Sequence, residues 1–175
     1  FEPLELVGRD IYVREGCYTC HSQMIRPFRS EVLRYGEVSE AGEFIYDHPF
    51  QWGSKRTGPD LHRVGGKYPN LWHYNHMIDP RSTSPGSNMP SYAFLAEQKV
   101  DHGDVALKMN AMRTLGVPYD AEAVSLSATH AASMAEAIVK DLAAAGQVSV
   151  DPDSELVALI AYLQRLGKNQ PVPSS

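Results

Sequence analysis

Two cysteines and the histidine that follows them carry the clearest chemical signal in the sequence. Cys17, Cys20 and His21 form a Cys-x-x-Cys-His pattern, and the chain holds no other cysteine. This spacing is typical of covalent haem attachment: two thiols about one helical turn apart add to the porphyrin vinyl groups, and the histidine becomes an axial ligand of the iron. The sequence therefore predicts one covalently bound haem c, held through Cys17, Cys20 and His21.

Three other uses of a cysteine pair remain open. A thioredoxin-like redox pair has the same spacing but belongs to a βαβ unit, for which the sequence gives no sign. A structural zinc site would have to join the cysteines to His73 and His76, whose position departs from the zinc-finger pattern. A disulfide between Cys17 and Cys20 would be strained across so short a loop. Haem attachment is the use that the pattern favours.

The second axial ligand of the iron is expected to be Met89. This residue lies in a loop far enough from Cys20 to reach the opposite haem face, and Pro90 stiffens the chain beside it. Met24 is too close to Cys20 for this role, and Met77 is ambiguous. The remaining methionines lie on predicted helical stripes, where methionine usually fills a core: Met109, Met112 and Met134. The alternative is a bis-histidine iron, whose second ligand would be His48, His62, His73 or His76.

A histidine and methionine pair would leave no open coordination position. Thioether ligation favours ferrous iron and raises the reduction potential. The sequence thus predicts one-electron transfer rather than catalysis or gas binding at the iron. A haem-based gas sensor, which needs a vacant or labile iron position, is the alternative from another functional class.

Residues near the motif are candidates for supporting the haem. The carbonyl of Pro59 could accept the Nδ1 proton of His21 and fix the imidazole ring, although the segment could equally be an ordinary turn. Basic side chains could pair with the haem propionates or simply be exposed, because guanidinium matches carboxylates well. The candidates for this pairing are Arg26, Arg29, Lys55 and Arg56.

Bulk properties place these residues in a globular protein. The chain has 175 residues, of which 43% are apolar and 21% charged, so one well-packed domain is expected rather than disorder. Its net charge of −5 gives no reason to expect nucleic acid as a partner. No stretch approaches the roughly 20 apolar residues of a membrane-spanning helix. Because the sequence starts at Phe1 without a signal peptide, we expect a trimmed, soluble product.

The elements on either side of the haem motif differ in their patterns. A short helix is predicted over 5–15, with Ile11 and Tyr12 packed inward and Gly8 placed where another backbone can come close. From 22 to 90 the sequence is dense in Gly, Pro, Ser, Asn and aromatic residues, which predicts mostly loop with short helical turns. So long a loop needs something to organise it, and a large buried cofactor would do so.

Helical patterns return in the second half of the chain. After Asp101, apolar residues recur at spacings of four and three and stop before 116–118. An alanine-rich helix is expected from about 120 to 146. Its predicted apolar stripe holds Met134, Ile138 and Leu142.

The last helix is the best marked by its ends. Asp151 is expected to be its N-cap, Pro152 its first residue and Gly167 its terminator. Its predicted apolar stripe consists of Leu156, Leu159, Ile160 and Leu163. The sequence shows no internal repeat and no convincing strand.

Together these features resemble class I cytochromes c. The resemblance rests on Gly8 and Tyr12, on Gly58-Pro59-Asp60-Leu61, on Met89-Pro90 and on Leu159 to Leu163. It implies that the first and last helices cross near the haem, and that Pro59 has the carbonyl role described above. We expect an all-α, class I cytochrome c fold with enlarged loops and extra helices before the C-terminal helix.

A single domain over 1–175 follows from the same resemblance. The cytochrome core is expected to cover about 5–95 and 151–167. The helices of about 101–146 would form an insertion, and we expect its alanine-rich part over 120–146 to be a peripheral helix or a partner contact.

A closer resemblance extends from about residue 6 to 167. The segments Arg14 to Arg29, Gly42 to Phe44, Tyr46 to Phe50, Trp52 to Leu61 and Met89 to Tyr92 are similar to the mono-haem subunit of cbb(3)-type cytochrome c oxidases. The resemblance implies a subunit of a proton-pumping, oxygen-reducing haem-copper oxidase. Oxygen chemistry itself is not expected on this chain.

The resemblance also implies partners and a location. Electrons would come from the di-haem cytochrome c subunit and pass to the haem b and copper-containing catalytic subunit. Family members sit on the periplasmic side of the bacterial inner membrane, held by an N-terminal membrane helix that this sequence lacks. A free periplasmic cytochrome c or the small subunit of nitric oxide reductase is the nearest alternative, against which the extended segment 22–50 argues.

Overall fold

The computed structural model describes residues 1–146 and 148–168, and within these the secondary structure is helical with no β-strand. The expected all-α, cytochrome c-like fold is confirmed. None of the described helices has the length and apolar character required to cross a membrane. The α-helices are α1 (Pro3–Arg14), α2 (Arg29–Tyr35), α3 (Asn70–Ile78), α4 (Pro80–Thr83), α5 (Val105–Thr114), α6 (Ala121–Ser125), α7 (Ser127–Gly146) and α8 (Glu155–Arg165). Short 3-10 helices cover Cys17–Thr19, Ala41–Phe44, Ala93–Ala96 and His102–Asp104.

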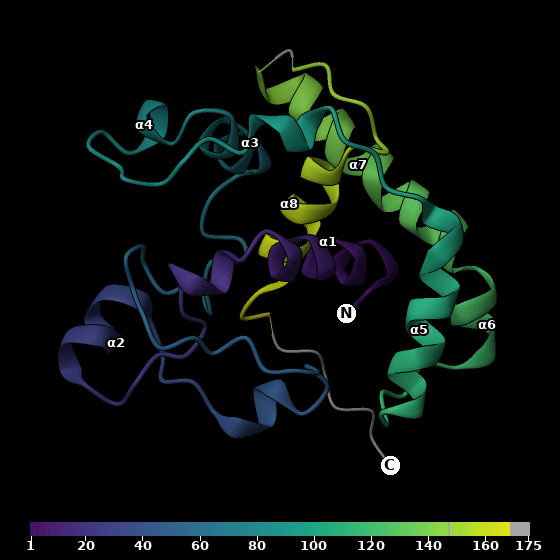
Figure 1. The fold of residues 1–175 in the computed structure, drawn as a ribbon, viewed down its shortest axis with the longest axis horizontal. Coiled ribbons are helices and arrows are strands. Elements are labelled where there is room, and N and C mark those ends of the chain that lie inside the picture. Colours follow the sequence, from purple (N-terminus) through teal and green to yellow (C-terminus); the bar gives the residue numbers. More distant parts are fainter. Residues whose placement is uncertain (147, 169–175) are drawn as a thin grey trace.

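Helices α1 and α8 cross at the centre of the molecule (Figure 1). Gly8 makes the crossing possible, because a Cβ at this position would lie 1.9 Å from the carbonyl oxygen of Ala158. The rings of Tyr12 and Tyr162 pack beside this contact with their centroids 5.2 Å apart. The expected close approach at Gly8 and the crossing of the first and last helices are therefore present.

The apolar stripe of α8 is fully buried, as predicted, but the start of the helix differs from the prediction. Ser154 is the N-cap, because its side chain accepts a hydrogen bond from the Val157 amide. Asp151 lies three residues earlier, where its carboxylate pairs with Lys99. Pro152 consequently belongs to the turn before the helix. Both Asp151 and Ser154 are good capping residues, and sequence alone does not rank them.

The predicted helix over 120–146 is in fact two helices, α6 and α7, separated at Leu126. The buried Ser127 hydroxyl donates to the Val124 carbonyl oxygen across this break. On α7 the fully buried positions are Ala131, Ala135 and Leu142, whereas Met134 and Ile138 of the predicted stripe are only partly buried. The prediction for α5 is confirmed, since Val105, Met109 and Met112 are all buried.

The segment between α1 and α3 is mostly loop, as expected, and lies on the other side of the molecule from α5, α6 and α7 (Figure 1). It is attached to α1 by a buried ion pair, in which the Arg9 Nε atom lies 2.6 Å from Asp47 Oδ1. A second ion pair, between Arg63 and Glu43, closes the loop on itself. Ion pairs therefore stabilise this region, whereas apolar packing stabilises the helices.

Candidate haem site

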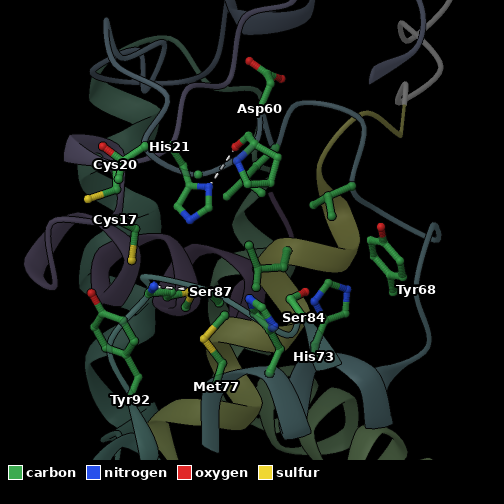
Figure 2. A pocket seen from close by; sticks show the side chains of 18 of the residues that line it. Cys17, Cys20, His21, Asp60, Tyr68, His73, Met77, Ser84, Ser87 and Tyr92 are labelled. Carbon is green, nitrogen blue, oxygen red and sulfur yellow. Dashed lines mark hydrogen bonds between the residues drawn. The ribbon is translucent and has the colours of Figure 1, made fainter. Parts of the chain in front are cut away.

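A cavity of about 600 Å³ lies between the loop region and helices α3 and α8. Its volume falls in the range typical of small-molecule and cofactor sites. Figure 2 shows Cys17, Cys20 and His21 on one side of this cavity and Met77 and His73 on the other. The structure thus gathers the whole Cys-x-x-Cys-His motif at one wall.

The ring of His21 points into the cavity (Figure 2) and is fixed from behind. Its Nδ1 atom donates to the Pro59 carbonyl oxygen at 2.8 Å. Since a carbonyl can only accept, this bond places the proton on Nδ1 and leaves the lone pair on Nε2. Burial lowers the pKa of His21, an effect that the Pro59 carbonyl partly opposes. The imidazole therefore directs Nε2 toward the cavity, where it could bind a metal.

Gly58 explains how the ring fits. A Cβ on Gly58 would lie 2.3 Å from Cε1 of His21, so only glycine leaves room for the imidazole. The Gly58 amide also donates to the Cys20 carbonyl oxygen at 2.9 Å. This pair of contacts holds the Pro59 loop directly against the haem motif.

The two cysteines are both free thiols, with Cys17 half-buried and Cys20 exposed. The motif closes one helical turn, because the His21 amide donates to the Cys17 carbonyl oxygen at 3.0 Å. Burial raises the pKa of the Cys17 thiol to about 12. The thiols are thus unpaired and lie at the edge of the cavity (Figure 2), which is the arrangement that attachment to a porphyrin requires.

Two methionines, Met77 and Met89, line the cavity. Met89 is half-buried in its loop, where its amide is held by the Ser87 hydroxyl at 3.2 Å. Met77 lies on α3 and its carbonyl oxygen accepts from the Tyr92 amide at 2.8 Å. Sequence reasoning left Met77 ambiguous, and the structure shows that it shares the cavity with Met89 because α3 forms its floor.

Histidines also reach the cavity, from α3. His73 and His76 line it, whereas His48 and His62 do not; His62 is buried against the Ser39 hydroxyl. Burial lowers the pKa of His73 to about 4. The Nε2 atom of His73 has no hydrogen-bond partner among the described residues. A cavity wall with such a buried polar atom fits a site that receives a further group.

The rest of this wall is aromatic. The ring of Trp72 stacks on Tyr68 at a centroid distance of 4.0 Å and on His76 at 4.6 Å. His73 packs edge-on against Trp72. A flat, rigid wall of stacked rings suits a large planar cofactor such as a porphyrin.

Behind the motif, the Asp60 carboxylate joins the two segments that hold His21. It is completely buried and accepts hydrogen bonds from the Ser22 hydroxyl at 2.6 Å and from the Met24 amide at 2.8 Å. Its other oxygen accepts from the His62 amide at 2.9 Å. We call this set of bonds the Asp60 clasp. It was not foreseen from the sequence, because a single aspartate after Pro59 carries no signal of the donors it will meet.

The cations expected at the haem carboxylates lie elsewhere. Arg26, Lys55 and Arg56 are not among the residues that line the cavity. Arg56 is held in the clasp region by Glu31 and by the Ser22 hydroxyl, Arg26 pairs with Glu31, and Lys55 is exposed. The basic residues that do line the cavity are Arg34, Arg63 and Lys67.

Other uses of the cysteines find little support. In the part of the chain that the structure describes, no three His, Cys, Asp or Glu side chains gather where they could hold a metal ion. The thioredoxin-like alternative needs a βαβ unit, and the described residues contain no strand. The site instead combines a fixed imidazole, two free thiols, a thioether and a planar wall, and these residues fit a haem.

Comparison with known proteins gives an independent result. A search of curated proteins found no significant match to the chain. The family model described as cytochrome c oxidase, mono-heme subunit/FixO, matches residues 1–170. This match covers nearly the whole chain and agrees with the resemblance seen in the sequence. The chain belongs to the FixO family, the mono-haem subunits of cytochrome c oxidase.

Proposed function

We propose that this oxidase subunit carries one haem c bound covalently through Cys17 and Cys20, with His21 and Met89 as the axial ligands of the iron. The observation that carries the proposal is the orientation of His21. Its Nδ1–H group donates a hydrogen bond to the Pro59 carbonyl oxygen at 2.8 Å, so Nε2 is free for the iron. Met89 lines the same cavity from a loop, which can adjust to the iron more readily than Met77 on α3.

When bound, the haem supplies a one-electron couple between ferric and ferrous iron. The chain's residues keep the surroundings of that couple constant. Pro59 and Gly58 fix the His21 ring, and the Asp60 clasp fixes the backbone around it. A site that changes little between the two oxidation states favours fast electron transfer.

The haem carboxylates need partners in the same cavity. We propose Arg34, Arg63 and Lys67 for this role, because these are the cations that line it. Arg34 and Lys67 form no ion pair among the described residues, whereas the Arg63 guanidinium already pairs with Glu43, so Arg34 and Lys67 are the better placed of the three. Guanidinium groups pair with carboxylates through two parallel hydrogen bonds.

Within the oxidase, we propose that this subunit relays electrons on the periplasmic side of the membrane. It would accept them from the di-haem cytochrome c subunit and pass them to the haem b and copper-containing catalytic subunit. Membership in an oxidase subunit family supports the presence of such partners. We further propose that 1–175 acts as one cytochrome domain, in which α5 to α7 are an addition to the core.

Covalent attachment can be tested on the denatured protein. We expect the intact mass of the unmodified chain to include one haem, which acidified organic solvent does not extract. In a variant with both Cys17→Ser and Cys20→Ser, any haem should be extracted completely. Two titratable thiols in the purified unmodified protein, with no haem in its mass, would falsify the proposal.

The relay can be tested in the oxidase complex. If this subunit is removed, reductant should still reduce the di-haem subunit, while electron flow from it to the catalytic subunit should fall at least tenfold. Adding the subunit back should restore the flow. Unchanged flow in its absence would show that electrons bypass this chain.

A further inference from the structure

Helix α2 has two unlike faces. Glu31 and Tyr35 are one turn apart and face the protein, where Glu31 is buried and Tyr35 is half-buried. Phe28, Val32 and Leu33 face solvent, with 56%, 36% and 77% of their surface exposed. The helix therefore buries a carboxylate and exposes apolar side chains, which reverses the usual arrangement of a surface helix.

Glu31 anchors the helix in this orientation. Its carboxylate accepts from the Arg26 amide at 2.9 Å and pairs with Arg56, whose Nη1 lies 2.6 Å away. Hydrogen bonds from Arg56 and Arg26 lower the pKa of Glu31 to about 2 against the effect of burial, so the carboxylate stays ionised. Rotating α2 to bury Leu33 would break these bonds and strand buried charges, which is unfavourable.

The exposed face lies beside the cavity of the proposed haem. Arg34 and Tyr35, from the same helix, line that cavity. Figure 1 shows α2 at the rim of the loop region, away from α5, α6 and α7. A protein that docks on α2 would therefore lie close to the cofactor, where electron transfer needs a partner to be.

The charge around this face is distinctive. Arg26, Arg29 and Arg34 are all exposed beside the apolar side chains, although the whole chain has a net charge of −5. Arg26 also lies over the ring of Phe28, 5.5 Å from its centroid. Arginine with aromatic and aliphatic residues is typical of the energetically important centre of a protein interface. Complementarity would require acidic residues on the facing surface.

We propose that the α2 patch, formed by Phe28, Arg29, Val32 and Leu33, docks another subunit of the oxidase through an apolar surface that carries carboxylates. The proposal rests on the proposed electron-transfer function and on the family assignment, which provides subunit neighbours. A single oxidase partner is favoured over a lipid surface because the patch adjoins the haem cavity. The inserted helices α5 to α7 expose isolated leucines but lie away from that cavity.

The test compares two exposed leucines in the complete, detergent-solubilised oxidase. Leu33→Asp changes the α2 patch, and Leu107→Asp changes α5 at a position with 69% exposure. We expect Leu33→Asp to weaken retention of this subunit in the complex about tenfold or more, because it places a charge in an apolar contact. Leu107→Asp should leave retention unchanged. Both variants should keep the haem spectrum of the unmodified protein, which separates a failure of docking from a failure of the haem proposal.

A second pair of measurements identifies the surface that the patch meets. Arg29→Glu should weaken assembly, and more so at low salt, if the facing surface is acidic. Equal retention of the Leu33→Asp and Leu107→Asp subunits would overturn the proposal. It would also be overturned if Leu33→Asp left assembly intact but abolished binding of the haem-loaded chain to phosphatidylglycerol vesicles, since the patch would then be a lipid contact.

Discussion

The crossing of α1 and α8 and the loop that holds the haem motif are stabilised by opposite means. At the crossing, Gly8 meets the backbone of Ala158 among buried apolar residues. Around the motif, the Asp60 carboxylate and the Arg9–Asp47 pair hold segments that have no continuous core. The crossing helices thus form a frame that is stabilised by close packing. The loop depends instead on a few buried polar groups, all of which must form their hydrogen bonds.

This difference has a functional consequence. The packed frame is rigid and fixes where the cavity lies. The hydrogen bonds of the loop hold His21 and the backbone around it in place. The site therefore combines a position set by the helices with a lining set by polar contacts.

The largest expected effect comes from breaking the frame. Gly8→Ala would place a Cβ 1.9 Å from the Ala158 carbonyl oxygen, and a backbone atom cannot move aside as a side chain can. We expect the free energy of unfolding to fall by about 3 kcal/mol or more. Urea unfolding followed by circular dichroism measures this. Gly42→Ala, which has nothing within 4 Å, is the matched control and should stay within about 0.5 kcal/mol; similar losses in both would show that the crossing is not tight.

The next effect tests the polar side of the comparison. Asp60→Asn removes the charge from the clasp and presents an amide nitrogen to groups that are themselves donors. We expect a loss of about 2 to 4 kcal/mol in the free energy of unfolding. Asp10→Asn breaks the half-exposed pair with Lys108 and should cost less than about 1 kcal/mol. If the two substitutions cost the same, the clasp is no more than a surface interaction.

A pH measurement tests the burial of His73 in the aromatic wall of the cavity. Burial holds the pKa of His73 at about 4, below its ordinary value of 6.5. The unfolded chain therefore takes up a proton below about pH 6.5 that the folded chain refuses until about pH 4, so stability falls as the pH falls through this window. The expected loss from His73 is on the order of 3 kcal/mol.

The variant His73→Phe isolates this contribution. The slope of unfolding free energy against pH, between pH 6.5 and 4, should be smaller in the variant than in the unmodified protein. An identical slope in His73→Phe would mean that His73 takes up its proton in the folded state as well.

The smallest effect on stability is expected at Gly58, where a substitution should mainly change the position of the His21 ring. A Cβ there would lie 2.3 Å from the His21 ring, which can turn aside at the cost of its bond to Pro59. We expect Gly58→Ala to lower the unfolding free energy by only about 1 to 2 kcal/mol. Its haem spectrum, however, should show a displaced axial histidine. A normal spectrum would indicate that the ring has more room than the structure shows.

The sequence predicted the fold correctly where one regular pattern or one residue type has a single structural explanation. The stripe of Leu156, Leu159 and Ile160 predicted the buried face of α8, and Gly8 predicted the crossing. It was less accurate at ends and breaks, where similar residues compete: Ser154 rather than Asp151 caps α8, and the chain breaks at Leu126.

For the site, the spacing of the motif pointed to one wall of the cavity but not to all its surroundings. The roles of Asp60 and Arg56 depend on donors and carboxylates that approach from distant loops. No local sequence pattern predicts these contacts. Arg56 was expected at the haem carboxylates because a cation near the motif is all that the sequence shows. Long-range polar contacts of this kind become visible only in three dimensions.

The central claim, a haem with His21 and Met89 as axial ligands, is tested most directly by the near-infrared absorption band that reports methionine sulfur on ferric haem. Met89→Ala and Met77→Ala form the matched pair, since both side chains line the cavity. We expect the band in the unmodified protein and in Met77→Ala, and its loss in Met89→Ala together with carbon monoxide binding to the reduced form. A band that survives in Met89→Ala, or that is absent from the unmodified protein, would show that Met89 is not the axial ligand.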